Sequence, residues 1–267
     1  MKKIPLNDQK RIMTDILKYF DSICRKNNIK YSLIGGSMIG AIRHKGIIPW
    51  DDDIDVILDK ENYQKIINIL SKDNNEKYKL LKYGTTKDYY FPYPKLVATD
   101  TYLIEDICFK NCKEYGLFID IFCYNDMKKD KKIFKRIQLL NSLLSRKKLN
   151  FKKESLKQNF LRLNKNIISF LIGYKRLLKM KTKIEENNPD NKYVLSTWPV
   201  YAYEKEYQLQ EDIKEYIDVA FETVNAMVFK NYDSILKTTF GNYMELPPEG
   251  ERKVHSLNAY WRDKWKD

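Results

Sequence analysis

The fold is decided by one stretch, Pro49-Trp50-Asp51-Asp52-Asp53-Ile54-Asp55-Val56-Ile57-Leu58, in which an acidic loop runs into an apolar strand. The apolar side chains predict a buried β-strand over residues 54–58. Because residues i and i+2 of a strand share a face, we expect Asp53 and Asp55 to point the same way while Ile54 enters the core. Two carboxylates on one surface suit a hard divalent cation such as Mg²⁺. A solvated acidic loop is the alternative, and it does not explain the interleaved Ile54 and Val56.

Two further elements accompany this strand. Upstream, residues 31–34 predict a short strand that ends in Gly35-Gly36-Ser37 and leads into a short helix over residues 38–43. Glycines let a backbone approach a ligand closely, and the Ser37 hydroxyl with the first-turn N–H groups can bind a phosphate. Downstream, Asp120 is a single acid in the apolar run of residues 117–122. Such a carboxylate is either buried and paired or part of a functional site.

The remaining periodic segments indicate an α/β or α+β fold up to about residue 124. Apolar spacing predicts helices over residues 8–27, capped by Asn7 or Asp8, and 60–70, capped by Asp59. Further strands are expected at residues 78–83, 93–98, 101–104 and 219–229, and a helix at 232–240 that stops at Gly241 before a polar tail. Residues 127–187 have a helical pattern. We therefore expect a catalytic core at 1–126, a basic helical subdomain at 127–188 and a mixed segment at 189–267 that completes the core.

The net charge of +13 is concentrated in the helical segment. Residues 128–183 contain nineteen Lys or Arg and two acids, a net of +17, so the rest of the chain carries −4. A patch of this size attracts anionic lipid headgroups, polyanionic glycans or nucleic acid. A solvated, lysine-rich helix face is the equally weighted alternative.

The N-terminus lacks the pattern of a signal peptide, and no apolar stretch approaches the ~20 residues of a bilayer span. We expect a cytoplasmic protein, with contact at the inner face of the plasma membrane. The four cysteines are then expected to be reduced thiols. Cys108, Cys112 and Cys123 could supply zinc ligands with His44 or His255, but their spacing fits no common zinc module, and free thiols are the favoured interpretation.

Longer motifs carry a resemblance to a known family. The block from Gly36 to Val56, Gly-Ser-Met-Ile-Gly-Ala-Ile-Arg-His-Lys-Gly-Ile-Ile-Pro-Trp-Asp-Asp-Asp-Ile-Asp-Val, resembles the signature of the LicD family. So do the runs Gly-Leu-Phe-Ile-Asp-Ile-Phe from Gly116 and Phe-Gly-Asn-Tyr-Met-Glu-Leu-Pro-Pro from Phe240. The family is related to the fukutin-related proteins and lies within the nucleotidyltransferase superfamily. The departures, Ile39, Ile42 and Asn242, involve none of the acids.

The resemblance implies an α+β fold with a nucleotidyltransferase-like mixed sheet, and a Mg²⁺-dependent phosphotransferase, with Mn²⁺ as a substitute. Members move phospho-substituents from CDP-linked donors to glycans, most often phosphocholine from CDP-choline onto teichoic acid or lipopolysaccharide sugars, with release of CMP. Asp53, Asp55 and Asp120 would be the catalytic residues and metal ligands, with Asp120 as the base, while Asp51 and Asp52 orient the loop.

The expected substrate-binding residues fall into three groups. Gly36 and Ser37 would hold phosphate, and the basic residues Arg43, His44, Lys45 and Lys95 would neutralise its oxygens. A quaternary ammonium needs aromatic faces, for which Trp50 or the cluster Trp198, Tyr201 and Tyr203 are candidates, although aromatic side chains are more often part of a core. Arg252 and His255 resemble the basic tail of the family.

Three alternatives are set against this function. A true nucleotidyltransferase would release pyrophosphate from an NTP instead of CMP from a CDP-linked donor. Transfer of phosphoethanolamine, a phosphonate or a phospho-alditol would use the same motif. A non-catalytic module that grips RNA is the rival outside the enzymes, and it predicts salt-dependent binding that does not need the acids. The intact acidic triad argues against nucleic acid as the partner.

Overall fold

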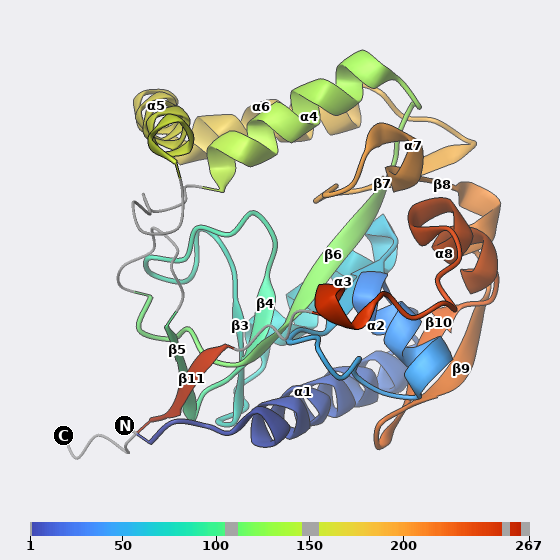
Figure 1. Ribbon diagram of the computed structural model, residues 1–267. Helices are drawn as coiled ribbons and strands as arrows, with labels where there is room; N and C mark the ends of the chain where they lie inside the picture. Colours follow the sequence, from blue (N-terminus) through green and yellow to red (C-terminus); the bar gives the residue numbers. More distant parts are fainter. Residues whose placement is uncertain (1, 105–111, 146–154, 253–256, 263–267) are drawn as a thin grey trace.

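The computed structural model describes residues 2–104, 112–145, 155–252 and 257–262 of the chain. Within these ranges the centre is a mixed sheet of seven strands with the order β1-β2-β6-β4-β3, to which β7 and β8 are joined through β6 (Figure 1). Strands β2 and β6 run parallel, and the other pairings in this sheet are antiparallel. The expected α+β class with a mixed sheet is therefore confirmed. The strands are β1 Ser32–Leu33, β2 Asp55–Leu58, β3 Tyr78–Leu81, β4 Lys95–Ala98, β6 Phe118–Asp126, β7 Tyr193–Ser196 and β8 Tyr207–Leu209.

Two amphipathic helices cover this sheet. Helix α1, Leu6–Lys26, contacts β4 and β6, and helix α3, Lys60–Lys72, contacts β2, β3 and β6. Asp59 caps α3 as predicted, because its Oδ1 accepts the N–H of Asn62 at 2.9 Å. The predicted cap of α1 is wrong: the helix starts after Pro5, whose extended backbone supplies the N-cap position without a side-chain bond.

Three helices form a separate layer that lies across the top of Figure 1. They are α4 Lys131–Leu144, α5 Leu156–Ile172 and α6 Tyr174–Glu186. Leucines of α4 and α6 pack with Tyr174 in a small cluster of their own, apart from the main core. After these helices the chain returns to the sheet, since β7 pairs with the end of β6. The domain limits at residues 126 and 188 remain a prediction.

The C-terminal part adds two pairs of strands. Strands β9 Tyr216–Phe221 and β10 Val224–Phe229 form a hairpin in the region where strands were expected, and Glu222, with a positive φ of 52°, lies in its turn. Strand β11, Asn258–Trp261, pairs with β5, Thr101–Ile104. Part of the predicted polar tail therefore forms a strand, which the sequence pattern did not indicate. The intervening elements are α7 Tyr203–Glu206, α8 Tyr232–Phe240 and the short 3-10 turns Gln210–Ile213 and Glu249–Glu251.

In the part of the chain that the structure describes, no helix is both long and apolar enough to cross a bilayer. Cys24, Cys112 and Cys123 are buried free thiols, as expected, and Cys108 lies outside the described residues. Burial raises the pKa of both Cys112 and Cys123, which disfavours the thiolate that zinc requires.

Candidate active site

The register of the central strands brings the predicted acids together. Asp55 at the start of β2 is the direct partner of Asp120 in the parallel strand β6, and Lys95 in β4 is the partner of Asp120 on its other side. Residues that face each other across neighbouring strands lie on the same side of the sheet. Asp55, Asp120 and Lys95 therefore form one row across three strands, although more than sixty residues separate the two acids in sequence.

Lys95 forms a buried ion pair with Asp120. Its Nζ lies 2.5 Å from Asp120 Oδ1, and the two side chains are 3% and 9% exposed. The ammonium also lies 3.3 Å from the centre of the Phe118 ring and 4.7 Å from that of Phe91, so π-faces as well as the carboxylate surround it. Lys95 was expected to neutralise phosphate oxygens, whereas here its charge faces the carboxylate of Asp120.

The glycine turn packs directly against the acids. Helix α2, Gly35–Ile39, continues as the π-helical turn Gly40–His44. A Cβ on Gly36 would collide with the Asp51 carboxylate, and one on Gly35 would lie 3.9 Å from Asp55 Oδ2. Gly35 also has φ +62°, which a side chain rarely adopts. Ser37 Oγ accepts the N–H of Asp55 at 2.9 Å, so the turn fixes the start of β2.

The acidic loop gathers more carboxylates than predicted. Asp51, Asp52 and Asp53 each present a carboxylate oxygen, and these oxygens lie within 4.8 Å of one another. Among the described residues, these three acids are close enough together to share a metal ion. Asp51 was expected only to orient the loop. The sequence signal that could have placed it in the site is Gly36, because the Asp51 carboxylate packs against this glycine.

Mutual repulsion marks this cluster electrostatically. Burial raises the pKa of Asp55 well above its usual range, and the charges of Asp53 and Asp120 raise it further while Lys95 lowers it. Burial, with Asp53 close by, raises the pKa of Asp51 to about 7. Hard carboxylate oxygens that repel one another in this way fit a divalent cation, whose charge would relieve the repulsion.

Basic and aromatic side chains from distant parts of the chain meet beside the loop. The Arg252 guanidinium lies 5.3 Å from the centre of the Trp50 ring, and the His44 ring is perpendicular to Trp50 at 5.9 Å. Arg43 donates to the carbonyls of Tyr243 at 2.5 Å and Glu245 at 2.9 Å. Arg43 was expected to neutralise phosphate oxygens, whereas here its guanidinium donates to backbone carbonyls and so anchors the C-terminal segment next to the loop.

The structure describes two further expected residues, Lys45 and Tyr201. The Lys45 side chain is exposed, and its left-handed backbone (φ 59°) presents a carbonyl that accepts the N–H of Glu222 at 2.8 Å. Tyr201 packs edge-on against Phe240, with 5.2 Å between ring centres. Burial raises the pKa of Tyr201 to about 12, with smaller contributions from the charge of Glu206 and from the acids of the site. His255 lies outside the described residues.

Trp198 and Tyr203 are not part of one aromatic cluster with Tyr201. Trp198 packs against Tyr93, with 5.4 Å between ring centres, whereas Tyr203 packs against Phe134 at 5.5 Å in a small core beside α4. The structure therefore places Trp198 and Tyr203 in different clusters. Of these two, Trp198 is the one that contacts Tyr93, the ring that lies beside the Lys95 ammonium.

Comparison with known proteins agrees with this arrangement. A family model described as LicD/FKTN/FKRP, nucleotidyltransferase domain, matches residues 28–158. The chain is also 32% identical over 269 residues to the lipopolysaccharide cholinephosphotransferase LicD of Haemophilus influenzae, covering 96% of this chain and 98% of that protein. The chain belongs to the LicD family.

Shorter stretches match other proteins. The ribitol 5-phosphate transferase FKRP of Homo sapiens is 39% identical over 46 residues, which are 17% of this chain and 9% of that protein. An uncharacterized protein of Rickettsia typhi is 35% identical over 71 residues, 25% of this chain and 23% of its own length. The range matched by the LicD family model contains the glycine turn, the acidic loop and Asp120, whereas Trp198, Tyr201 and Arg252 lie beyond it.

Lys10 contacts the acidic loop, and the sequence did not suggest it as a candidate site residue. Its Nζ donates to the carbonyls of Ile48 and Pro49, each at 2.9 Å, and so holds the loop just before the acids. Burial lowers the pKa of Lys10, against the charges of Asp51, Glu222 and Asp52. No local pattern in α1 distinguishes Lys10 from the other lysines, because its role depends on a contact nearly forty residues away in sequence.

Proposed function

We propose that the chain transfers phosphocholine from CDP-choline to a hydroxyl of a cell-surface glycan precursor and releases CMP. The observation that carries this proposal is the row of Asp55, Asp120 and Lys95 beside the glycine turn and the acidic loop. Similarity over almost the full length to a lipopolysaccharide cholinephosphotransferase supports the choice of the transferred group. The same similarity supports lipopolysaccharide as the acceptor class, and teichoic acid is the alternative. The basic segment 128–183 would hold a polyanionic precursor or an anionic membrane face nearby.

The residues would divide the work as follows. Asp53, Asp55 and Asp120, joined by Asp51, would hold Mg²⁺ or Mn²⁺, which when bound supplies positive charge to the diphosphate and to the leaving CMP. The first-turn N–H groups after Gly36 would contact phosphate oxygens of the donor. Trp50 and Arg252 lie beside the acids on the side of Arg43, where a nucleotide base and its phosphates would find an aromatic face and a cation.

The transfer itself forms one bond and breaks one. The acceptor oxygen attacks the phosphorus that bears choline, the bond from this phosphorus to the oxygen of CMP breaks, and the proton of the hydroxyl goes to Asp120. Lys95 holds the Asp120 carboxylate in place through the ion pair between Nζ and Oδ1. A weak base is sufficient, because phosphoryl transfer has a loose transition state with little need for early proton removal.

Thermal stability with a panel of nucleotides tests the proposal. A ligand at 100 times its dissociation constant stabilises the native state by about 2.7 kcal/mol, so CDP-choline with Mg²⁺ is expected to raise the melting temperature by several degrees. Asp55→Asn is expected to lose this shift, whereas Asp126→Asn, an exposed acid at the end of the neighbouring strand β6, keeps it.

Product analysis then separates the rival reactions. Release of CMP from CDP-choline supports the proposal, and a shift with a different CDP-alcohol alone would change the transferred group but not the mechanism. A shift with an NTP only, together with pyrophosphate as product, would replace the proposal by nucleotidyl transfer.

A further inference from the structure

We propose that the cavity between the segment before β4, helix α4 and the segment after β7 binds a sugar ring of the acceptor, with Asn141 as the residue that recognises its hydroxyls. The cavity has a volume of about 420 Å³ and is lined by Tyr90, Phe91, Tyr93, Trp198 and Asn141 among others. This is the size range and the apolar character of small-molecule sites. The inference rests on the proposed function for the identity of the ligand as an acceptor, but not for the existence of the site.

The cavity lies next to the predicted chemistry. Tyr93 packs against Trp198 on one side and against Phe122 at 4.7 Å on the other. Phe122 belongs to β6, two residues after Asp120, and the Lys95 ammonium lies 5.3 Å from the centre of the Tyr93 ring. A ligand that stacks on Tyr93 or Trp198 is therefore one side chain away from the Lys95–Asp120 pair.

Asn141 supplies the second, independent observation. This side chain belongs to α4 and is 5% exposed, yet within the described ranges neither its Nδ2 nor its Oδ1 has a hydrogen-bond partner. An unpaired buried amide is costly, and natural proteins rarely keep one without a reason. A ligand that offers both a donor and an acceptor would satisfy the two atoms together, as a hydroxyl group does.

The same requirement discriminates between a sugar and choline. A trimethylammonium group has neither a donor nor an acceptor for the Asn141 amide, and none of the described residues that line this cavity is an acid that could balance its charge. Aromatic faces beside amide and hydroxyl groups fit a sugar, which stacks through its C–H face and hydrogen-bonds through its rim. Choline of the donor would then occupy another place near the acids.

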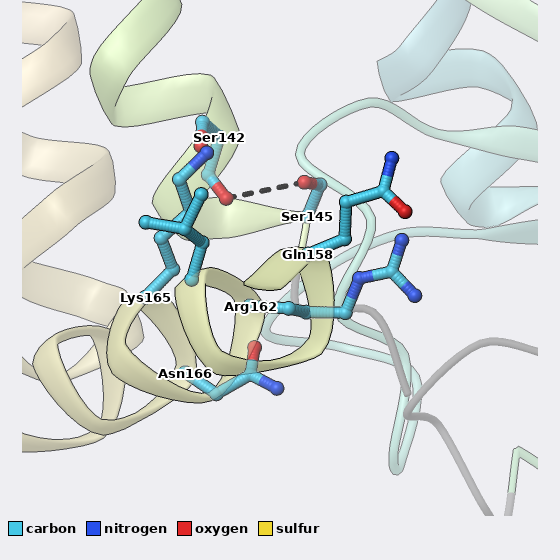
Figure 2. A pocket seen from close by; sticks show the side chains of 7 residues that line it. Ser142, Ser145, Gln158, Arg162, Lys165 and Asn166 are labelled. Carbon is cyan, nitrogen blue, oxygen red and sulfur yellow. Dashed lines mark hydrogen bonds between the residues drawn. The ribbon is translucent and has the colours of Figure 1, made fainter. Parts of the chain in front are cut away.

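A second, polar cavity continues from this one. Ser142 and Ser145 line both, and on the far side α5 contributes Gln158, Arg162 and Lys165 (Figure 2). The volume of this second cavity is about 390 Å³. The two cavities thus lie side by side, one with aromatic rings and one with basic side chains, which suits an acceptor with more than one sugar and an anionic group.

Saturation-transfer NMR tests the sugar site with methyl glycosides of common hexoses and N-acetylhexosamines, in the presence of CDP and Mg²⁺. We expect glycoside signals that weaken at least ~10-fold in Asn141→Leu and in Trp198→Ala. Asn141→Leu is also expected to melt at the same or a higher temperature than the wild type, because it replaces unpaired polar atoms by methyl groups.

A matched control is Asn159→Leu. Asn159 is equally buried in α5, but its Nδ2 donates to the Ser155 carbonyl at 3.1 Å, so this variant should lose stability and keep glycoside binding. Choline chloride signals that vanish in Trp198→Ala but survive in Asn141→Leu would assign the cavity to the donor and overturn the proposal, as would the absence of any glycoside binding. A CDP-choline thermal shift that is unchanged in Asn141→Leu shows that the donor site is intact, so failure of the sugar site is distinguished from failure of the proposed function.

A different observation, the inverted burial of α5, carries a second proposal. Eight of the fifteen exposed large hydrophobic residues in the described ranges lie on this helix, including Phe160 at 63%, Phe170 at 78% and Leu171 at 73% exposure. The buried residues of α5 are polar, Asn159 and Ser169. In a helix whose outer face meets water the reverse is expected.

We infer that the outer face of α5 lies in the interface of an anionic lipid bilayer. The helix contacts α4 and α6, and Figure 1 shows it at the outer edge of the helical layer. Its exposed apolar residues recur at helical spacing from Leu156 through Phe160, Leu163 and Ile167 to Phe170. Lys157, Arg162 and Lys165 are its charged residues, so α5 has three positive charges and no negative one. This charge complements anionic headgroups and would repel the same helix of a second copy.

Flotation with vesicles of phosphatidylcholine and phosphatidylglycerol tests the membrane face. The triple variant Phe160→Ser/Phe170→Ser/Leu171→Ser is expected to bind the vesicles at least ~100-fold more weakly, since each buried apolar side chain contributes severalfold to partitioning. The control Ile104→Ser/Leu246→Ser removes exposed apolar residues elsewhere and should bind like the wild type. Equal vesicle binding by the triple variant and the wild type would overturn the proposal. A wild-type protein that is a dimer in solution, with a triple variant that is a monomer, would also overturn it.

Discussion

The ion pair between Lys95 and Asp120 allows a prediction whose size follows from the structure. Both side chains are almost fully buried, so Lys95→Met would leave the carboxylate of Asp120 buried beside Asp55 without its cation. Removing one partner of a buried pair typically costs about 3–5 kcal/mol. For a chain of this length that is a fall in melting temperature of roughly 6–20 °C.

A double-mutant cycle isolates the pair. Asp120→Asn should also destabilise, because it leaves the Lys95 ammonium among aromatic rings without a carboxylate, whereas the double variant Lys95→Met/Asp120→Asn should be clearly more stable than the sum of the two losses predicts. Urea denaturation in EDTA at constant pH measures all four proteins. Losses that simply add, or a Lys95→Met protein as stable as the wild type, would refute the argument that the lysine balances this carboxylate.

Two further predictions concern the acidic loop. The pKa of Asp51 is raised to about 7 from an ordinary value of 3.8, so between these values the folded protein binds a proton that the unfolded chain has released. The free energy of unfolding in EDTA should therefore fall as pH rises from 5 to 8, by on the order of 2–3 kcal/mol. Asp51→Asn should flatten this dependence in thermal melts, and an unchanged profile would exclude the proposed crowding of carboxylates. Lys10→Met removes the hydrogen bonds to the carbonyls of Ile48 and Pro49, and it should weaken Mg²⁺-dependent CDP-choline binding, measured by the thermal shift, about 10-fold at a stability cost of about 1–2 kcal/mol. The control is Lys18→Met, which changes an exposed lysine of the same helix. Equal thermal shifts in the two variants would show that Lys10 does not support the site.

Local chemistry made several elements predictable. Alternating apolar residues around Asp55 can only form a strand that buries Ile54 and Val56, and a helix must start after Asp59 because that side chain caps the first turn. The same applies to α8, Tyr232–Phe240, which ends as predicted where Gly241 takes a positive φ of 71°. The motifs around Asp53, Asp55 and Asp120 were sufficient to indicate the family and the candidate acids.

Local chemistry was not sufficient where a contact joins distant segments. The charge partner of Asp120 depends on the order in which β2, β6 and β4 pair, and sheet order is a property of the whole chain. The polar tail could not be recognised as β11, because its pairing depends on the free edge that β5 offers. The aromatic candidates looked equivalent in sequence, and only packing separated Trp198 from Tyr203.

The sequence by itself thus determined the elements, the acids and the family, because strand periodicity, capping and motif spacing act over a few residues. The tertiary structure decided which charges meet, namely Lys95 with Asp120, Lys10 with the loop, and Arg252 with Trp50. It also decided that α5 turns its polar face inward and its apolar face outward. Amphipathic spacing fixes the two faces of a helix but not their direction, because direction depends on what the neighbouring helices bury.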